Sequence, residues 1–172
     1  MLVVGGSLGA KALNDVVPQA LALLPEAERP QVIHQSGVRQ IEALRANYQA
    51  AGVQAQLTPF IEDTATAFAQ ADLIVCRAGA STVTEIAAVG AAALFVPFPF
   101  AVDDHQTTNA QFVVQHGGGW LVPQPEFTPA SLAALWRSVT RAELLSKAEG
   151  AWAQKKNTAT QDVVAACEEL AL

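Results

Sequence analysis

The sequence predicts an α/β fold: a Rossmann-like, doubly wound parallel sheet of about six strands with a helical C-terminal extension. Short apolar runs alternate with longer segments of helical periodicity, as expected of βαβ units joined by right-handed crossovers. Several of these runs are apolar on both faces, which is typical of strands covered by helices on each side. After Pro123 only helical patterns follow, and these give the extension.

The elements follow in order along the chain. The six expected strands are LVV (2–4), QVIHQ (31–35), QAQLTPF (54–60), DLIVC (72–76), AALFVP (92–97) and GWLVP (119–123). Helical periodicity covers residues 9–24, 38–51, 63–71, 82–89 and 106–116. In the extension, Thr128 is a good N-cap and Pro129 suits a first helical position; RAELLSKAEGAWAQ and an Ala-rich tail from about 158 come after. No linker or repeat interrupts the pattern, so we expect residues 1–172 to form one domain.

Composition limits what the chain can bind. Its 172 residues are 51% hydrophobic, which is enough apolar material for an ordinary folded core. The formal net charge is −6, with only 10 Lys and Arg, and this excludes nonspecific nucleic-acid binding, which needs clustered cations. An anionic ligand must therefore be bound mainly by backbone amides and helix ends.

Several other classes of protein are excluded by pattern. There is no CxxC or HExxH spacing, so we expect no zinc site, and Cys76 and Cys167 fit free thiols in a reducing cytoplasm. Residues 86–102 carry no charge, but the run is short for a membrane span and Gly90 and Pro97 interrupt it.

In doubly wound sheets, ligands bind beyond the carboxyl ends of the strands, near a switch in strand order. Four loops therefore carry the candidate site: GGSLGAK (5–11), TPFIED (58–63), CRAGAST (76–82) and PFPFAVDDHQTTN (97–109). The first keeps only the G-x-x-G of Gly6 and Gly9 from the dinucleotide fingerprint, and it lacks the GK[ST] of a P-loop. It predicts either an anion-binding helix start or a simple tight turn.

The segment CRAGASTVTE (76–85) makes the sharper prediction. Gly79 and Ala80 leave room above a strand end, and we expect a helix to begin at Ser81 and Thr82, with unpaired amides suited to a diphosphate. Glu85, expected on the first turn, would then accept hydrogen bonds from both hydroxyls of a ribose. The alternative is a capping box in which Glu85 bonds only the Thr82 amide.

Taken alone, TPFIED favours an ordinary loop, with Asp63 as the N-cap of the next helix. Its extended backbone nevertheless offers the N–H and C=O pair needed to read a uracil edge. His34, near a strand end, is expected to make a local hydrogen bond rather than act as a base.

Within DDHQTTN (103–109), His105 and Gln106 are candidates to donate to sugar hydroxyls or phosphate oxygens. The alternative is a solvated turn and N-cap. Asp103 and Asp104 are adjacent and so do not form the D-x-D pattern that many nucleotide-sugar enzymes use to hold a metal.

Four segments in one order resemble the donor-binding half of the MurG family of bacterial undecaprenyl-diphospho-muramoylpentapeptide β-N-acetylglucosaminyltransferases. They are GGSLGAKALN, HQSG, TPFIEDTATAFAQADLIVCRAGASTVTEIAAVG and ALFVPFPFAVDDHQTTNA, and they cover nearly the whole chain. The resemblance implies the C-terminal half of a GT-B fold, in which the active site lies between two Rossmann-like domains. It also implies transfer of GlcNAc from UDP-GlcNAc to lipid I, giving lipid II for peptidoglycan by inverting displacement.

The resemblance assigns roles by position. Ser7, beside Gly6, would contact phosphate, and the backbone of Ile61 would read uracil. Glu85 would hold the ribose. Gln106 and its neighbour His105 would hold the GlcNAc hydroxyls. The helix start under the diphosphate would comprise Ala80, Ser81, Thr82, Val83 and Thr84. No catalytic residue, metal or cofactor is implied within this chain.

The family's N-terminal domain, with its GGTGGH loop, the expected base and the lipid I and membrane contacts, is not in this sequence. We therefore expect a donor-binding fragment of a cytoplasmic enzyme that is peripheral on the inner membrane. Three alternatives stay open: the donor half of another GT-B lipid glycosyltransferase, a stand-alone nucleotide-sugar-binding subunit that needs a partner chain, and an NAD-dependent oxidoreductase. The incomplete glycine fingerprint argues against the last.

Overall fold

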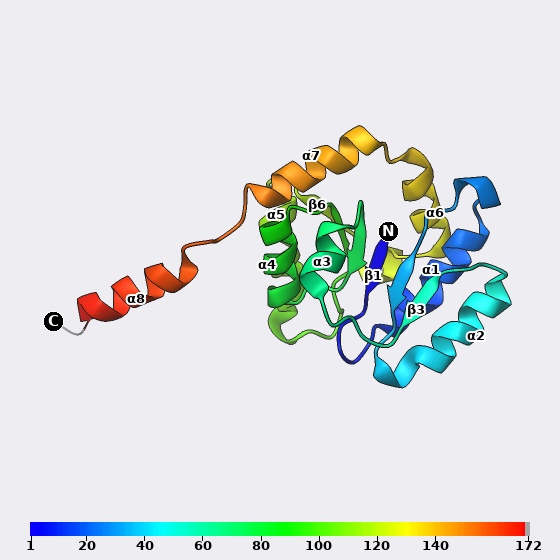
Figure 1. Cartoon of the computed structure of the whole chain (residues 1–172), viewed down its shortest axis with the longest axis horizontal. Helices are drawn as coiled ribbons and strands as arrows, with labels where there is room; N and C mark the ends of the chain where they lie inside the picture. Colours follow the sequence, from blue (N-terminus) through cyan, green and yellow to red (C-terminus); the bar gives the residue numbers. More distant parts are fainter. Residues whose placement is uncertain (171–172) are drawn as a thin grey trace.

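The computed structural model of the chain, which describes residues 1–170, contains one parallel sheet of six strands (Figure 1). The strands are β1 (Leu2–Val4), β2 (Ile33–Gln35), β3 (Gln56–Thr58), β4 (Ile74–Cys76), β5 (Ala93–Phe95) and β6 (Gly119–Leu121). Their order is β3-β2-β1-β4-β5-β6, and every neighbouring pair is parallel. The order changes direction between β1 and β4, which is the switch point of a doubly wound sheet. The predicted fold class is confirmed, and each predicted run contains one strand.

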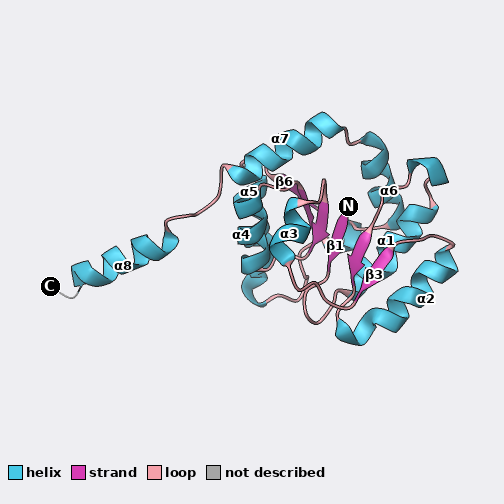
Figure 2. Cartoon of the chain, viewed as in Figure 1, coloured by secondary structure: helices cyan, strands magenta, loops and turns pink. Residues whose placement is uncertain are grey.

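Helices cover both faces of this sheet (Figure 2). On one face lie α1 (Lys11–Ala22), α2 (Ile41–Ala51) and α6 (Pro129–Ser138). On the other lie α3 (Thr64–Ala69), α4 (Ala80–Val89), α5 (His105–Val114) and α7 (Arg141–Trp152). Short 3-10 helices span Glu26–Glu28, Val38–Gln40, Val102–Asp104 and Gln124–Glu126.

Alternate residues along the strands pack into two separate cores, one on each face of the sheet. Val3 and Val75 pack on the α1 side of the sheet, whereas Leu2, Ile74 and Phe95 pack on the α4 side. All five are buried. Each such side chain contributes about 1.5–3 kcal/mol when it leaves water, so the strands are anchored from both faces. The carboxyl ends of the strands are thereby held in fixed positions relative to one another.

Two predicted helix caps are confirmed. The Thr128 hydroxyl accepts a hydrogen bond from the Ser131 amide, and Pro129 occupies the first turn of α6. The Asp63 carboxylate accepts a hydrogen bond from the Thr66 amide at the start of α3. Each cap satisfies one of the amides that a helix start leaves free.

The last helix, α8 (Ala159–Leu170), stands apart from the sheet at the end of an extended segment (Figure 1). None of its residues is buried. Across residues 1–170, no helix combines the length and the apolar character that crossing a membrane requires.

Candidate functional site

A hollow of about 760 Å³ lies at the carboxyl ends of β1, β4 and β5, at the switch point of the sheet. Four predicted site residues line it: Gly6, Ser7, Thr82 and Gln106. The other lining residues are Val4, Gly5, Leu8, Gly9, Ala10, Lys11, Ala12, Asp15, Gln40, Arg77, Gly79, Phe98 and Gln124. The loops that follow β1, β4 and β5 therefore meet at one place, as the strand-end rule predicts.

Two helices start at this hollow, and neither start has a side-chain cap. The N-cap of α1 is Ala10, and the N-cap of α4 is Gly79. Within residues 1–170, the first-turn amides of both helices have no hydrogen-bond partner. A helix start carries roughly half a positive charge. Two such starts face one hollow, an arrangement that favours an anion over a cation.

The residue pattern predicts the start of α4 one residue too late, whereas the start at Ala80 that the family resemblance implies agrees with the structure. The helix begins at Ala80, not at Ser81, because the chain leaves the extended conformation at Gly79. Thr82 is therefore the third helical residue, and the capping box with Glu85 does not form. Glu85 lies on the second turn rather than the first, exposed and without a hydrogen-bond partner in the described part of the chain.

Seven predicted residues do not line the hollow: Ile61, Ala80, Ser81, Val83, Thr84, Glu85 and His105. Val83 is buried in the core and its amide donates to the Gly79 carbonyl, so it has no free group to offer a ligand. The Thr84 hydroxyl donates to the Ala80 carbonyl inside the helix. One ring nitrogen of His105 bonds the Val102 carbonyl at 2.7 Å, and the ring is exposed.

Ile61 follows β3, and its half-buried side chain packs against the core on the α4 side. Its N–H and C=O have no hydrogen-bond partner within residues 1–170. The backbone at this position therefore keeps both the donor and the acceptor that were predicted for it.

The glycine-rich loop after β1 is held by Gln35, a residue whose role the sequence did not reveal. The Gly5 and Gly6 amides both donate to Gln35 Oε1 at 3.1 Å. Gln35 Nε2 donates to the carbonyls of Gly6 and Pro59 at 3.0 Å, so one buried side chain joins the loops after β1 and β3. The only signal for this role in the sequence was that a polar residue ends a buried strand beside a glycine-rich turn.

Gln106 has a fixed orientation. Its Oε1 accepts hydrogen bonds from the Phe98 amide at 3.0 Å and the Ala78 amide at 3.3 Å. Because two N–H groups meet that atom, it must be the oxygen, and Nε2 is the group left for a ligand. Asn109 Nδ2 donates to the Ala78 carbonyl at 3.1 Å and holds the same loop from the other side.

Cationic side chains are few in this hollow, as composition predicted. Lys11 forms an ion pair with Asp15, so its charge is compensated. Arg77 is half-buried, and burial lowers the pKa of its guanidinium. No ion pair joins Arg77 to a carboxylate within residues 1–170. The sequence did not mark Arg77 as a site residue, because the segment CRAGAST does not show which groups the arginine side chain contacts.

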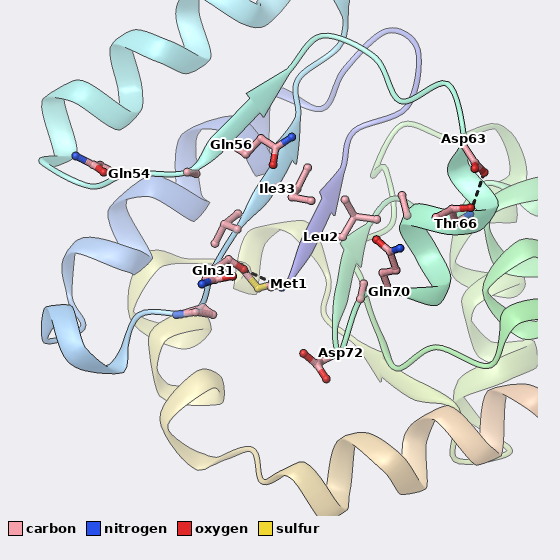
Figure 3. Close-up of a pocket in the computed structure, with 15 residues that line it drawn as sticks. Met1, Leu2, Gln31, Ile33, Gln54, Gln56, Asp63, Thr66, Gln70 and Asp72 are labelled. Carbon is pink, nitrogen blue, oxygen red and sulfur yellow. Dashed lines mark hydrogen bonds between the residues drawn. The ribbon is translucent and has the colours of Figure 1, made fainter.

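A larger hollow of about 1030 Å³ lies near the amino ends of β1 to β4 (Figure 3). Gln31, Gln56 and Gln70 line it together with the carboxylates of Asp63 and Asp72 (Figure 3). Among the residues that the structure describes, no Lys or Arg side chain lines it. This surface does not suit an anion, so the smaller hollow at the switch point is the candidate site.

His34 lies inside the protein, away from solvent. Its ring nitrogens bond the Tyr48 hydroxyl and Asn14 Oδ1, both at 3.0 Å. Burial lowers the pKa of His34 to about 3, so the ring is neutral at physiological pH. The prediction that His34 is not a base is consistent with this position, although its partners are distant in sequence rather than local.

This histidine makes stability depend on pH. The unfolded chain binds a proton at His34 near pH 6.5 and the folded chain does not, so the free energy of unfolding should fall as pH drops below that value. The slope from this group approaches about 1.4 kcal/mol per pH unit. Urea unfolding between about pH 7.5 and 5.5 measures it. His34→Gln should remove that part of the slope, and the exposed His116→Gln should keep it; equal slopes in wild type and His34→Gln would contradict the assignment.

Residues 1–165 match the family model described as the glycosyltransferase family 28 C-terminal domain. A relative from Polaromonas naphthalenivorans (strain CJ2) is 71% identical over 99% of this chain and 48% of its own length. A relative from Azoarcus sp. (strain BH72) is 60% identical over 99% of this chain and 48% of its own length. Both are named UDP-N-acetylglucosamine--N-acetylmuramyl-(pentapeptide) pyrophosphoryl-undecaprenol N-acetylglucosamine transferase. The chain therefore spans about half the length of these relatives.

Solved structures agree with the sequence relatives. The crystal structure of Acinetobacter baumannii MurG matches with a TM-score of 0.88 and 47% identity, over 98% of this chain and 49% of that one. The glycosyltransferase VinC matches with a TM-score of 0.62 at 19% identity, over 89% of this chain and 36% of that one, which shows a shared fold alone. By its family match and its relatives, the chain belongs to the glycosyltransferase family 28 C-terminal domain family.

Proposed function

We propose that residues 1–172 form the UDP-GlcNAc-binding domain of a two-domain inverting glycosyltransferase that converts lipid I to lipid II. One observation carries the proposal: two uncapped helix starts, of α1 and α4, open onto one hollow at the switch point of the sheet. A diphosphate is the part of a nucleotide sugar that such a place binds. The names of the 60–71% identical relatives supply the sugar and the acceptor.

The chemistry follows from where charge develops. When the acceptor hydroxyl attacks the anomeric carbon, the bond from that carbon to the diphosphate oxygen breaks and its electron pair stays on UDP. Negative charge therefore grows at the diphosphate, beside the helix starts, and dipoles already oriented there stabilise it without reorganisation. The proton of the acceptor hydroxyl must go to a base outside this chain, in which we assign no catalytic residue.

The remaining groups can be assigned to parts of the donor. The unpaired carboxylate of Glu85 suits the two ribose hydroxyls, and the free N–H and C=O of Ile61 suit the uracil edge. The exposed Ser7 hydroxyl suits a phosphate oxygen, and Gln106 Nε2 suits a hydroxyl of GlcNAc. His105 has one ring nitrogen left for the same sugar.

The other half of the enzyme would hold lipid I and contact the membrane. We infer that the whole enzyme is a peripheral protein on the cytoplasmic face of the inner membrane. It would there serve peptidoglycan synthesis, and through it cell shape and division. We assign neither a metal ligand nor a cofactor site to this chain.

Calorimetric titration of the 172-residue chain tests this proposal. We expect UDP-GlcNAc and UDP to bind and NADH and GDP-mannose not to bind. We also expect no transfer of GlcNAc to lipid I by this chain alone. Binding of NADH without binding of UDP would overturn the proposed ligand, and measurable turnover of lipid I would show that the chain holds more than the donor half of the site.

A further inference from the structure

Arg77 joins the ends of three strands. It directly follows β4, and its Nη1 donates to the carbonyls of Val96 and Pro97, just beyond β5, at 3.0 Å each. Its Nη2 donates at 2.6 Å to the side-chain oxygen of Gln124, beyond β6. The guanidinium also lies 5.4 Å from the centre of the Phe98 ring. Four contacts thus fix a side chain that lines the candidate site.

One peptide group connects Arg77 to Gln106. The carbonyl of the Pro97–Phe98 peptide accepts from Arg77, and the N–H of the same peptide donates to Gln106 Oε1 at 3.0 Å. The second N–H on that oxygen belongs to Ala78, the residue immediately after Arg77. The guanidinium therefore holds the peptide that carries one of the two donors to Gln106, and the other donor belongs to the residue next to Arg77 in the chain.

We propose that Arg77 is a positioning residue that fixes the Pro97–Phe98 peptide and thereby aims Gln106 Nε2 at the sugar of the bound donor. The identity of that ligand rests on the proposed function. The orientation of Gln106 does not, since it is a property of the chain without ligand.

The geometry requires an arginine. A guanidinium is a planar fork that donates to two carbonyls and to Gln124 at once, whereas a lysine ammonium is a single point of charge. A cation on a peptide carbonyl also polarises that peptide, so its N–H becomes a stronger donor to Gln106. Because no ion pair engages Arg77 within residues 1–170, this polarisation is not offset by a paired carboxylate.

A ligand-free measurement tests the positioning itself. In nitrogen-15 relaxation of the 172-residue chain, we expect the side-chain amide of Gln106 to be rigid in wild type and mobile in Arg77→Met. The Gln106 side-chain amide should also be mobile in Arg77→Lys, because a lysine ammonium lacks the planar guanidinium that holds the Pro97–Phe98 peptide. Arg45→Met, which removes an exposed arginine paired with Glu42, is the matched control and should leave Gln106 rigid. A rigid Gln106 amide in folded Arg77→Lys and Arg77→Met would overturn the proposal.

A binding measurement separates positioning from direct contact with phosphate. Arg77→Met should weaken binding of UDP-GlcNAc about tenfold and change binding of UDP less than twofold, because only the sugar reaches Gln106. In a Gln106→Ala background, Arg77→Met should add no further loss. Equal losses for both ligands, or fully additive losses, would overturn the proposal in favour of a phosphate contact. Wild type that binds neither ligand would refute the proposed function, and the relaxation result would still decide whether Arg77 positions Gln106.

Discussion

Replacing Glu85 with alanine is expected to weaken UDP binding by about 1.5–3 kcal/mol, roughly 10- to 150-fold, and to leave stability nearly unchanged. The large loss follows from the proposed pair of charge-assisted hydrogen bonds from the ribose hydroxyls to one carboxylate. The small effect on stability follows from the structure, because Glu85 is exposed and has no partner within residues 1–170. Alanine is also the better helix former at this position in α4.

This experiment separates the proposed ribose contact from a purely structural role of Glu85. A glutamate that closed a capping box would lower stability by about 1 kcal/mol when removed and would hardly affect UDP. Calorimetry gives the affinity and urea unfolding gives the stability of the same variant. Glu149→Ala, an exposed glutamate within α7, is the matched control and should change neither quantity. Unchanged UDP affinity in Glu85→Ala would remove Glu85 from the donor site.

The sheet could be predicted because its signals are local. Each strand needs an apolar run with turn residues at its ends, and the runs at 72–76 and 92–97 show this clearly. Their observed cores, Ile74–Cys76 and Ala93–Phe95, are shorter. Asp72 and Leu73 come before the first paired residue of β4, at its amino end, and Val96 and Pro97 belong to the loop after β5. Composition also predicted correctly that cations would be scarce there.

The contacts between loops could not be predicted, because they depend on which strand ends become neighbours. Gln35 bonds glycines about thirty positions away, and Arg77 bonds carbonyls about twenty positions away. The start of α4 was missed for the same reason. Ala78 is held through its amide by Gln106 and through its carbonyl by Asn109, so the chain is already positioned when it turns into the helix at Ala80. The spacing of Thr82 and Glu85 matched a capping box, but the helix starts at Ala80 and no such box forms.

Replacing Gly9 with alanine should be the most damaging change in the glycine-rich loop. We expect a loss of about 3–5 kcal/mol in the free energy of unfolding, from a left-handed backbone and a steric clash together. Gly9 has φ +77°, and a Cβ placed on it would lie 2.0 Å from the Ser36 carbonyl oxygen. The loops after β1 and β2 would have to separate, and the start of α1 would move away from the hollow with them.

Gly6 provides the matched control, because its φ of +79° is almost the same and, among the residues that the structure describes, only its chain neighbours lie within 4 Å of the position a Cβ would take. Gly6→Ala should therefore cost only the backbone part, about 1–2 kcal/mol. Urea unfolding of both variants isolates the cost of close approach, since the conformational cost is shared. Equal losses in the two variants would contradict close packing between the loops. A larger loss for Gly9→Ala, together with weakened UDP binding, would show that the position of the α1 helix start depends on contact between neighbouring loops as well as on its own sequence.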